Sequence, residues 1–524
     1  MAGRAFTTGQ MQGYEREIIE RMRAGQGNRE VLADGQTRQQ TMERHPHLSV
    51  SQRNAVEEVL TSRDRMMALE GVAGGGKTTS LAAVREAAVS AGYEVEGLAP
   101  TSRAAQKLAE AGMGTETLQR HLTRGDRADD GQKRLYIVDE SSMASTRQMH
   151  TFVERLKEND RVLFVGDVRQ HEAVEAGRPY AQLQEAGLRT ARLDEIIRQK
   201  DPALKEAVEQ LARGDVREAI SNLNGQGRVH EIGDRSERIA EIAREYVRQP
   251  ENTLVVSPDN ESRREINSQI HRAMQGAGQV KEEEHAVRVL NARQELTGAD
   301  RQHARNYEAS DVIRYSKGSK LLGLEPGEYA KVVRTNETEN TVTVERTSGQ
   351  ELSYDPRRLQ GVTVYREEER TFAEGDRVQM TAPYHEQKLA NRELGTVERI
   401  DGKGNLALRM DSGREAEFNI RQHPHLDYGY AVTSHSSQGQ TADRALVHVD
   451  SEQAHGQLLN SRMAYVSVSR AKFDVQIYTN DAKTLGQKLS RDVTKATALS
   501  QQELGEKSKP QSLGVELSQG LSVG

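Results

Sequence analysis

The stretch Gly71-Val72-Ala73-Gly74-Gly75-Gly76-Lys77-Thr78 matches the pattern G-x-x-x-x-G-K-[ST], which binds nucleotide phosphates. Met66–Glu70 before it is an apolar segment short enough for a buried strand. Thr79–Ser90 after it is rich in alanine and has the spacing of a helix. A strand, a glycine loop and a helix are the context that this pattern requires. We therefore predict a nucleotide site in which Lys77 reaches the β- and γ-phosphates and Thr78 binds Mg²⁺.

Length and composition limit the class of protein. A chain of 524 residues is expected to form several domains. It contains no cysteine, no apolar stretch of about 18 residues and no apolar N-terminal segment, so we expect neither disulfides, thiolate metal sites, membrane helices nor a signal peptide. These features favour a cytoplasmic protein. The net charge is −6, so any basic surface for nucleic acid must be local, and with 4% aromatic residues extensive base stacking is not expected.

Two carboxylates follow the next strongly apolar segment, Leu135–Val138. Asp139 is placed to hold Mg²⁺, directly or through water, and Glu140 to activate water as a general base. Acidic residues at a strand end can instead cap a helix, a task that Ser141 and Ser142 could equally perform. Together with the phosphate loop, the pair favours nucleotide hydrolysis.

Three further side chains are candidates for contact with the nucleotide. Gln170 follows the apolar strand Val162–Val165 and could sense the γ-phosphate or the attacking water. Arg198 could clamp a phosphate, because a guanidinium binds phosphate in a bidentate way. Arg470 closes a strand-like run that starts at Met463, and could act as an arginine finger; alternatively it is a surface arginine.

A glutamine lies one short helix upstream of the phosphate loop. We expect Ser51 to cap that helix, which reaches Leu60, and the amide of Gln52 to pair with adenine. Downstream, Thr101 and Ser102 follow the strand that ends at Pro100, and their hydroxyls could hold a nucleic-acid backbone. The alternative for them is an ordinary capped turn.

A second apolar core begins at Thr253–Ser257 and resumes at 430–441 and 463–472, after a long insertion. The insertion contains two copies of one alternating pattern with glycine turns, the first from Arg314 and the second from Thr371, and both are typical of small SH3-like antiparallel barrels. Such modules could contact partners or DNA, or could serve as rigid spacers. The predicted domains are an N-terminal helical segment (1–47), a first core (48–185), the first part of a second core (186–285), the inserted repeats (286–423), the second part of the second core (424–495) and a disordered tail (496–524).

These segments, taken together, resemble the motifs of superfamily-one helicases in their order along the chain. Thr433–Gly439 is similar to the RecD-like, 5′-to-3′ branch, and 165–171 with 427–430 is similar to the helicase part of conjugative relaxase–helicases of the TraI/TrwC type. The resemblance covers about residues 6–490. It rests on Leu48–Gln52, Gly71–Thr79, Ala99–Leu108, Val138–Met143, Gly166–Val174, Leu193–Gln199, Tyr430–Gly439 and Tyr465–Lys472.

The resemblance implies an α/β fold with two RecA-like parallel-sheet cores, ATP between them, and an SH3-like insertion in the second core. It implies catalytic roles for Lys77, Glu140, Gln170, Arg198 and Arg470, Mg²⁺ binding by Thr78 and Asp139, and nucleotide contacts by Gln52, Gly71, Gly74, Gly76, Lys77, Thr78, Thr79 and Gly439. It implies contacts to single-stranded DNA by Thr101, Ser102, Thr117, His121, Thr433 and His435.

The function that this resemblance implies is an ATP-dependent DNA helicase that moves 5′ to 3′ in a bacterial cytoplasm, in conjugative DNA transfer, with relaxase or other conjugation proteins as further partners. Two alternatives stay open. One is a DNA-binding module that has lost motor activity, and the other is a scaffold that recruits partners of a relaxase. Relatives carry a strand-separating pin between Leu118 and Lys133, and this segment is short and charged here.

Overall fold

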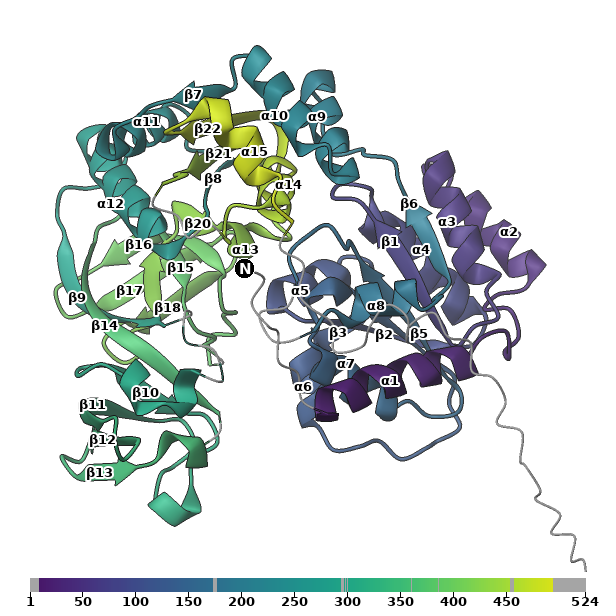
Figure 1. The fold of residues 1–524 in the computed structure, drawn as a ribbon, viewed down its shortest axis with the longest axis horizontal. Helices are drawn as coiled ribbons and strands as arrows, with labels where there is room; N and C mark the ends of the chain where they lie inside the picture. Colours follow the sequence, from purple (N-terminus) through teal and green to yellow (C-terminus); the bar gives the residue numbers. More distant parts are fainter. Residues whose placement is uncertain are drawn as a thin grey trace, which may run out of the picture.

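The computed structural model describes residues 9–172, 177–293, 296, 298, 300–359, 361–384, 386–452 and 457–492. In this part of the chain, two parallel sheets form the two cores and two antiparallel sheets form the insertion (Figure 1). The cores lie side by side, and the insertion extends away from the second core. The predicted α/β fold, with two parallel-sheet cores and a β-rich insertion in the second, is confirmed.

The first core is a parallel sheet with the strand order β3-β2-β4-β5-β1-β6. Along β1, side chains alternate between two clusters: Met67 and Leu69 pack with α3 and α4, while Met66 and Ala68 pack with α1, α7 and α8. Helices thus cover both faces of the sheet, which explains why all seven residues of β5 are buried. The elements are α1 (Gly9–Ala24), α2 (Gly35–Arg44), α3 (Val50–Leu60), β1 (Met66–Gly71), α4 (Lys77–Ser90), β2 (Glu94–Ala99), α5 (Ser102–Ala109), β3 (Gly114–Thr117), α6 (Leu118–Thr123), β4 (Arg134–Val138), the 3₁₀ turn Ser141–Met143, α7 (Thr146–Glu154), β5 (Asp160–Gly166), α8 (Pro179–Glu185) and β6 (Thr190–Leu193).

The second core is a parallel sheet with the order β20-β8-β21-β22-β7. Its central strand β21 pairs with β8 and β22, so strands from both sides of the insertion form one sheet. The elements are α9 (Pro202–Arg213), α10 (Val216–Gly225), β7 (Val229–Glu231), α11 (Arg235–Arg248), β8 (Thr253–Ser257), α12 (Asn260–Gly276), β20 (Ala431–Thr433), α13 (Ser434–Ser437), β21 (Ala442–Val449), α14 (Ser461–Val468), β22 (Ala471–Thr479) and α15 (Ala482–Leu489).

Three details of the sequence prediction are wrong. The first core does not end at residue 185, because β6 (Thr190–Leu193) pairs with β1 in the first sheet. The strand-like run before Arg470 is the helix α14, whose residues 463–468 are all buried; a short apolar run of this kind suits a buried helix as well as a strand. Helix α3 is capped by Ser49 rather than by Ser51, since Ser49 and Gln52 form a reciprocal capping box.

The insertion contains two modules with the same strand order. The first module is β10–β13 closed by β14, and the second module is β15–β18 closed by β19. The same number of residues, 65, separates the bulges at Val332 and Val397 and the bridges at Ser319 and Tyr384, so the repeat read from the sequence is also a repeat of backbone geometry. The strands are β9 (His285–Ala292), β10 (Val312–Tyr315), β11 (Glu328–Asn336), β12 (Thr341–Arg346), β13 (Glu351–Tyr354), β14 (Val362–Phe372), β15 (Arg377–Met380), β16 (Leu394–Ile400), β17 (Asn405–Met410), β18 (Glu415–Asn419) and β19 (Leu426–Tyr428), with 3₁₀ turns at Asp300–Gln302, Ala304–Asn306, Lys320–Leu322 and Pro356–Arg358.

The two modules differ in how they are packed. Side chains of the second module, such as Val378 and Leu408, belong to one hydrophobic cluster with Val255 and Ile266 of the second core. The first module has a separate cluster around Ile313. The predicted tail, 496–524, lies outside the described residues. Among the helices that are described, none is long and apolar enough to cross a membrane.

Candidate functional site

The phosphate loop lies between β1 and α4 and depends on two glycines in left-handed conformations. Gly74 and Gly76 have φ of 84° and 75°. A Cβ at Gly74 would lie 2.5 Å from the Cβ of Arg198, and a Cβ at Gly76 would lie 2.3 Å from the amide nitrogen of Gln52. Both the backbone angle and the space therefore require glycine. Lys77 folds over the loop and donates to the carbonyl of Gly71 at 2.6 Å.

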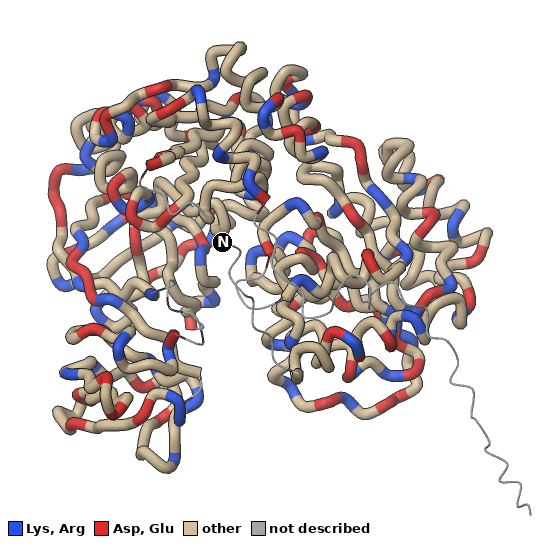
Figure 2. The backbone as a smooth tube through the Cα atoms, in the orientation of Figure 1, with Lys and Arg blue, Asp and Glu red and all other residues tan. Residues whose placement is uncertain are grey.

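A cavity of about 400 Å³ opens between the loop and the second core. Its lining contains six basic side chains against three carboxylates, although over the whole chain acidic residues outnumber basic ones and the two signs are interspersed along both cores (Figure 2). This local excess of positive charge suits a triphosphate. The charged residues are Lys77, Lys107, Arg198, Lys200, Arg470 and Lys472, with Asp139, Glu140 and Asp167. Also on the wall are Gly74, Gly76, Thr78, Thr79, Gln170 and Gly439, all predicted from the sequence.

The paired carboxylates stand at the end of β4. Burial, followed by the neighbouring charge of Asp139, raises the pKa of Glu140 to about 7. Burial also raises the pKa of Asp139, and one oxygen of that carboxylate accepts a hydrogen bond from the Glu140 N–H at 2.8 Å. Glu140 adopts a left-handed φ of 50°, which is uncommon for a residue with a Cβ and is concentrated at functional sites. A buried carboxylate with a pKa near neutrality can both take up and release a proton at physiological pH.

Thr78 and Asp139 form a donor set that fits Mg²⁺. Mg²⁺ prefers oxygen ligands and is usually held by one or two carboxylates together with the phosphates of the substrate. Because burial disfavours the ionised form of Asp139, a cation beside it would offset that penalty. The described residues contain no cluster of three or more His, Cys, Asp or Glu suited to a metal ion. Phosphate oxygens and water are the usual remaining ligands of Mg²⁺ in such a site.

Gln170 is oriented by a hydrogen-bonded group that includes the second core. The amide nitrogen of Gln170 donates to Asp167 Oδ2 at 2.8 Å. The hydroxyl of Tyr465, in α14, donates to the same oxygen at 2.9 Å. Gln170 is 7% exposed and Tyr465 is 1% exposed. The predicted sensor is therefore held by a residue that the sequence did not single out.

Two arginines approach the cavity from different parts of the chain. Arg198 follows β6 and donates to the carbonyl of Ser469 at 2.7 Å. Burial, followed by the nearby charge of Arg470, lowers the pKa of Arg198 to about 9. Arg470 follows α14, is 2% exposed, and donates from Nε to the carbonyl of Val466 at 2.8 Å. Among the described residues, neither guanidinium forms a salt bridge with a carboxylate, so the pair is arranged for an anion such as a γ-phosphate.

Gln52 lies against the loop but is not among the residues that line the cavity. Its amide oxygen accepts from the Ser49 N–H at 2.9 Å, and its amide nitrogen donates to the Gly76 carbonyl at 3.2 Å. In this structure the side chain caps α3 and supports the loop, and its contact with adenine stays a prediction. Gly71 is likewise absent from the lining.

A second cavity, of about 420 Å³ and called the groove below, brings together most of the residues predicted to bind DNA. Thr101, Ser102 and Thr117 line it from the first core, and His435 lines it from the second core. Glu140 and Gln438 line both the groove and the cavity beside the phosphate loop. One wall comes from the second module, through Asn391 and Arg392. The sequence did not indicate these two residues, because only the docking of the second module places them there.

Two arginines in the groove, Arg103 and Arg392, have guanidinium groups that can bind an anion. Nη2 of Arg103 donates to the carbonyl of Arg392 at 3.2 Å, whereas Nη1 of Arg103 is buried without a hydrogen-bond partner among the described residues. Burial lowers the pKa of Arg103 and of Arg392. No carboxylate of the described residues forms a salt bridge with Arg392. A phosphate would satisfy both guanidiniums.

The predicted threonines all cap helices. Thr101, Thr117 and Thr433 accept hydrogen bonds from the N–H groups of Ala104, Arg120 and Ser436, respectively. The capped turn that was the alternative for Thr101 is thus present, although a hydroxyl that accepts one bond can still donate another.

The two predicted histidines have different surroundings. His435 stacks on His171 with 3.8 Å between ring centroids, and His171 is within 2.7 Å of the Ser434 hydroxyl. Burial, followed by the charge of His435, holds the pKa of His171 well below its ordinary value. His121 instead lies 3.3 Å from Glu116 and packs edge-on against Tyr136, away from the residues that line the groove.

Two basic side chains of α5 line different cavities. Lys107 lines the cavity beside the phosphate loop, whereas Arg103 lines the groove. The first turn of α5 thus contributes Arg103 to the groove, and the next turn contributes Lys107 to the other cavity. Within the segment from Leu118 to Lys133, where a pin was considered, α6 ends at Thr123 and residues 124–133 form no helix or strand. Its residues are tied to the first core by Arg127–Asp160 at 3.0 Å and Lys157–Asp126 at 2.9 Å.

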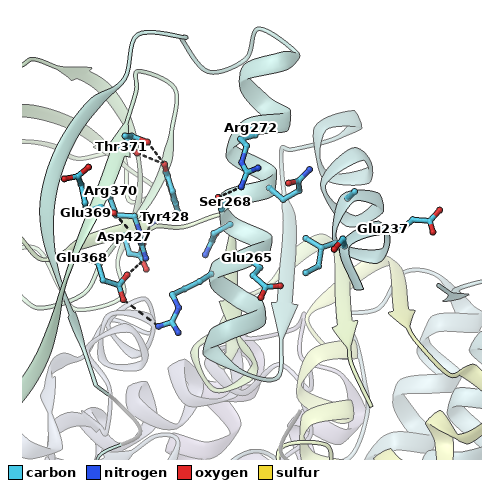
Figure 3. Close-up of a pocket in the computed structure, with 16 residues that line it drawn as sticks. Glu237, Glu265, Ser268, Arg272, Glu368, Glu369, Arg370, Thr371, Asp427 and Tyr428 are labelled. Carbon is cyan, nitrogen blue, oxygen red and sulfur yellow. Dashed lines mark hydrogen bonds and ion pairs between the residues drawn. The ribbon is translucent and has the colours of Figure 1, made fainter. Parts of the chain in front are cut away.

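A larger cavity, of about 960 Å³, lies elsewhere, between α11, α12, β14 and β19 (Figure 3). Arg370 on its wall pairs with Glu368 and with Asp427, the latter at 3.0 Å, and Arg272 donates to Ser268 at 3.1 Å. The pair between Arg370 and Asp427 joins β14 to β19 of the second module. None of the residues predicted for a site lines this cavity.

Comparisons with known proteins agree with the geometry of the first core. A family profile described as AAA domain matches residues 47–234. The multifunctional conjugation protein TraI of Escherichia coli is 27% identical over 511 residues, which cover 86% of this chain and 28% of TraI. The ATP-dependent RecD2 DNA helicase of Deinococcus radiodurans is 36% identical over 157 residues, covering 29% of this chain and 21% of RecD2. The resemblance to RecD-like helicases of the conjugative type is confirmed.

This chain spans less than a third of the length of either relative. Among solved structures, Bacteroides Pif1 bound to single-stranded DNA is 16% identical with a TM-score of 0.49, over 84% of this chain and 94% of that chain.

Proposed function

We propose that this chain is an ATP-dependent DNA helicase and translocase that moves 5′ to 3′ on single-stranded DNA in conjugative transfer. The observation that carries this proposal is the cavity beside the phosphate loop, called the nucleotide cavity. The phosphate loop and the paired carboxylates of the first core line it together with Arg198 and Arg470. A cavity that needs both cores to complete it is suited to convert nucleotide binding into motion of one core against the other.

In this proposal, ATP phosphates bind to the N–H groups of 74–78, and Lys77 leaves the Gly71 carbonyl to reach them. Glu140 accepts a proton from water as the water attacks the γ-phosphate, and ADP and phosphate are released. Arg198 and Arg470 stabilise the charge that develops on the phosphate oxygens. Mg²⁺, held by Thr78 and Asp139, would neutralise charge on the phosphates.

Single-stranded DNA would occupy the groove. Arg103 and Arg392 would bind backbone phosphates, and Ser102 with Thr101 would donate to phosphate or sugar oxygens. Contacts to phosphate and sugar do not distinguish between bases, so the affinity should depend little on the DNA sequence. Because these contacts are electrostatic, added salt should weaken binding. Because Glu140 and Gln438 border both cavities, occupation of the groove can affect hydrolysis directly.

The test is ATP hydrolysis with and without single-stranded DNA, for the wild type and for Glu140→Gln. We expect strong stimulation by DNA in the wild type and a loss of at least about a hundredfold in the variant, since a general base contributes about 10²–10⁴-fold. The variant should still bind ATP and DNA. A wild type that binds DNA but hydrolyses no ATP would favour the degenerate binding module instead.

A further inference from the structure

Helix α14 of the second core contacts the turn that follows β5 of the first core at several points. Arg462 donates to the carbonyls of Val168 and Gln170, at 3.1 and 2.7 Å, and pairs with Glu172 at 2.7 Å. One turn further along the helix, Tyr465 donates to Asp167 at 2.9 Å. The turn that carries the sensor Gln170 is therefore held largely by side chains of the other core.

Tyr465 also contacts the phosphate loop. Its hydroxyl oxygen accepts a hydrogen bond from the N–H of Ala73 at 2.7 Å. The Tyr465 hydroxyl thus accepts one hydrogen bond, from the phosphate loop, and donates another, to Asp167. Burial raises the pKa of Tyr465 well above its ordinary value, so the phenol keeps the proton that it donates.

These contacts form one continuous chain of hydrogen bonds. It runs from the N–H of Ala73 through Tyr465 to Asp167 Oδ2, which also accepts from the amide of Gln170 at 2.8 Å. Both partners of Tyr465 belong to the first core, while Tyr465 belongs to the second. Separation of the cores would break both bonds together, and Asp167 would keep only donors from its own turn, Arg169 and Gln170.

We propose that Tyr465 is a positioning residue that couples closure of the two cores to the orientation of Gln170 at the γ-phosphate. This inference rests on the proposed function. Tyr465 would not touch the nucleotide itself but would act through Asp167. Its effect should appear when the γ-phosphate is being transferred and not when a diphosphate is bound.

Tyr465→Phe tests the proposal, because the ring keeps its place in the cluster with Val468 and Leu204 while the hydroxyl is lost. Leaving buried partners unsatisfied costs about 1–3 kcal/mol, equivalent to about 5- to 150-fold. We expect binding of ADP with aluminium fluoride, a mimic of the transferred phosphate, and DNA-stimulated turnover to fall within that range. Binding of ADP alone should change by less than about twofold, because no γ-phosphate is present.

Tyr478→Phe is the matched control. Tyr478 is a buried tyrosine of the same core, its ring stacks on His230, and it does not line the nucleotide cavity. Tyr478→Phe should have the wild-type affinity for ADP with aluminium fluoride and the wild-type DNA-stimulated turnover. Asp167→Asn supplies the second comparison. If Tyr465 acts through Asp167, the double variant should bind ADP with aluminium fluoride as tightly, and hydrolyse ATP as fast, as Asp167→Asn alone.

Three results would overturn the role of Tyr465: unchanged binding of the transition-state mimic, an equal loss for ADP and the mimic, or additive losses with Asp167→Asn. Any of them, in a wild type with normal DNA-stimulated hydrolysis, contradicts only this inference. A wild type without hydrolysis contradicts the proposed function as well.

Discussion

The two inserted modules share a backbone but differ at the positions that face the rest of the molecule. Gly323 and Gly327 of the first module have left-handed φ values of 66° and 86°. The matching residues of the second module, 65 positions on, are Lys388 and Arg392, which adopt φ values of 55° and 66° despite their side chains. A left-handed residue with a Cβ costs about 1–2 kcal/mol relative to one in the right-handed region.

At these two positions the second module bears this cost, whereas at Ser310, which has a φ of 78° and is matched by Gly375, the first module bears it. Among the described residues of the two modules, only those of the second module line the groove. Strained backbone tends to persist where function requires the side chain. Of two modules with one strand order, the first is therefore packed around its own cluster, and the second shares the cluster of the second core and lines the groove.

A buried aspartate repeats in both modules with a different partner. Asp311 accepts from the N–H of Glu308 at 2.9 Å, and Asp376 accepts from the N–H of Ala373 at 2.8 Å. Asp311 pairs with Arg293 at 2.7 Å, whereas Asp376 bonds to His271 at 2.7 Å and to Tyr430 at 2.6 Å. Asp376 thus attaches the second module to His271 of α12, a group that titrates, whereas Asp311 is held by an arginine directly after β9, a strand of the first module's own sheet.

The largest expected effect comes from removing these carboxylates. Asp376→Ala and Asp311→Ala should each cost about 3 kcal/mol, because each leaves buried donors without a partner. For Asp376→Ala the loss should extend into the second core, since the two share a cluster, and hydrogen exchange of β8 should accelerate. For Asp311→Ala the loss should stay within the first module, and faster exchange in β8 would contradict the separation of the two clusters.

A smaller effect is expected when the second module is given the residue of the first. Arg392→Gly removes a guanidinium but keeps the carbonyl that accepts from Arg103. We expect affinity for single-stranded DNA to fall about fivefold to tenfold and the salt dependence to decrease by about one phosphate contact. Fluorescence anisotropy over a range of salt concentrations would measure both.

Gly327→Arg is the reciprocal control. It should destabilise the first module by about 1 kcal/mol and leave DNA binding unchanged. Equal DNA affinity for wild type and Arg392→Gly, or weaker binding by Gly327→Arg, would remove the functional distinction between the modules.

The smallest effect should be a pH dependence confined to the second module. Burial alone would lower the pKa of His271, but its bonds and charge interactions with Asp376 and Glu284 outweigh burial, so the pKa is raised above 6.5. The stabilisation is fully present below 6.5 and is lost as pH rises through the raised pKa. Amide exchange, corrected for its intrinsic pH dependence, should show less protection in the second module at high pH and no such change in the first. His271→Gln should abolish the difference.

Local patterns in the sequence predicted many of the residues that line the cavity beside the phosphate loop. Lys77, Thr78, Asp139 and Glu140 are each fixed by a strand and the turn directly after it, so a short segment contains the whole signal. The residues that sequence reasoning missed depend on docking between distant segments: Tyr465 meets Ala73, and Arg392 meets Arg103, across hundreds of residues. Ser49 was missed for a different reason, because Ser49 and Ser51 are both good caps and only the geometry of Gln52 distinguishes them.

The interrupted second sheet has a consequence for synthesis of the protein. In that sheet, Leu254 of β8 pairs with Ala445 of β21, and the whole insertion lies between them in the chain. As the ribosome works from the N-terminus, the first core and both barrels can fold while β8 still lacks its neighbour. The nascent chain must therefore keep an apolar strand edge from aggregating until residues 431–449 emerge, and the second sheet can assemble only after the whole insertion has been translated.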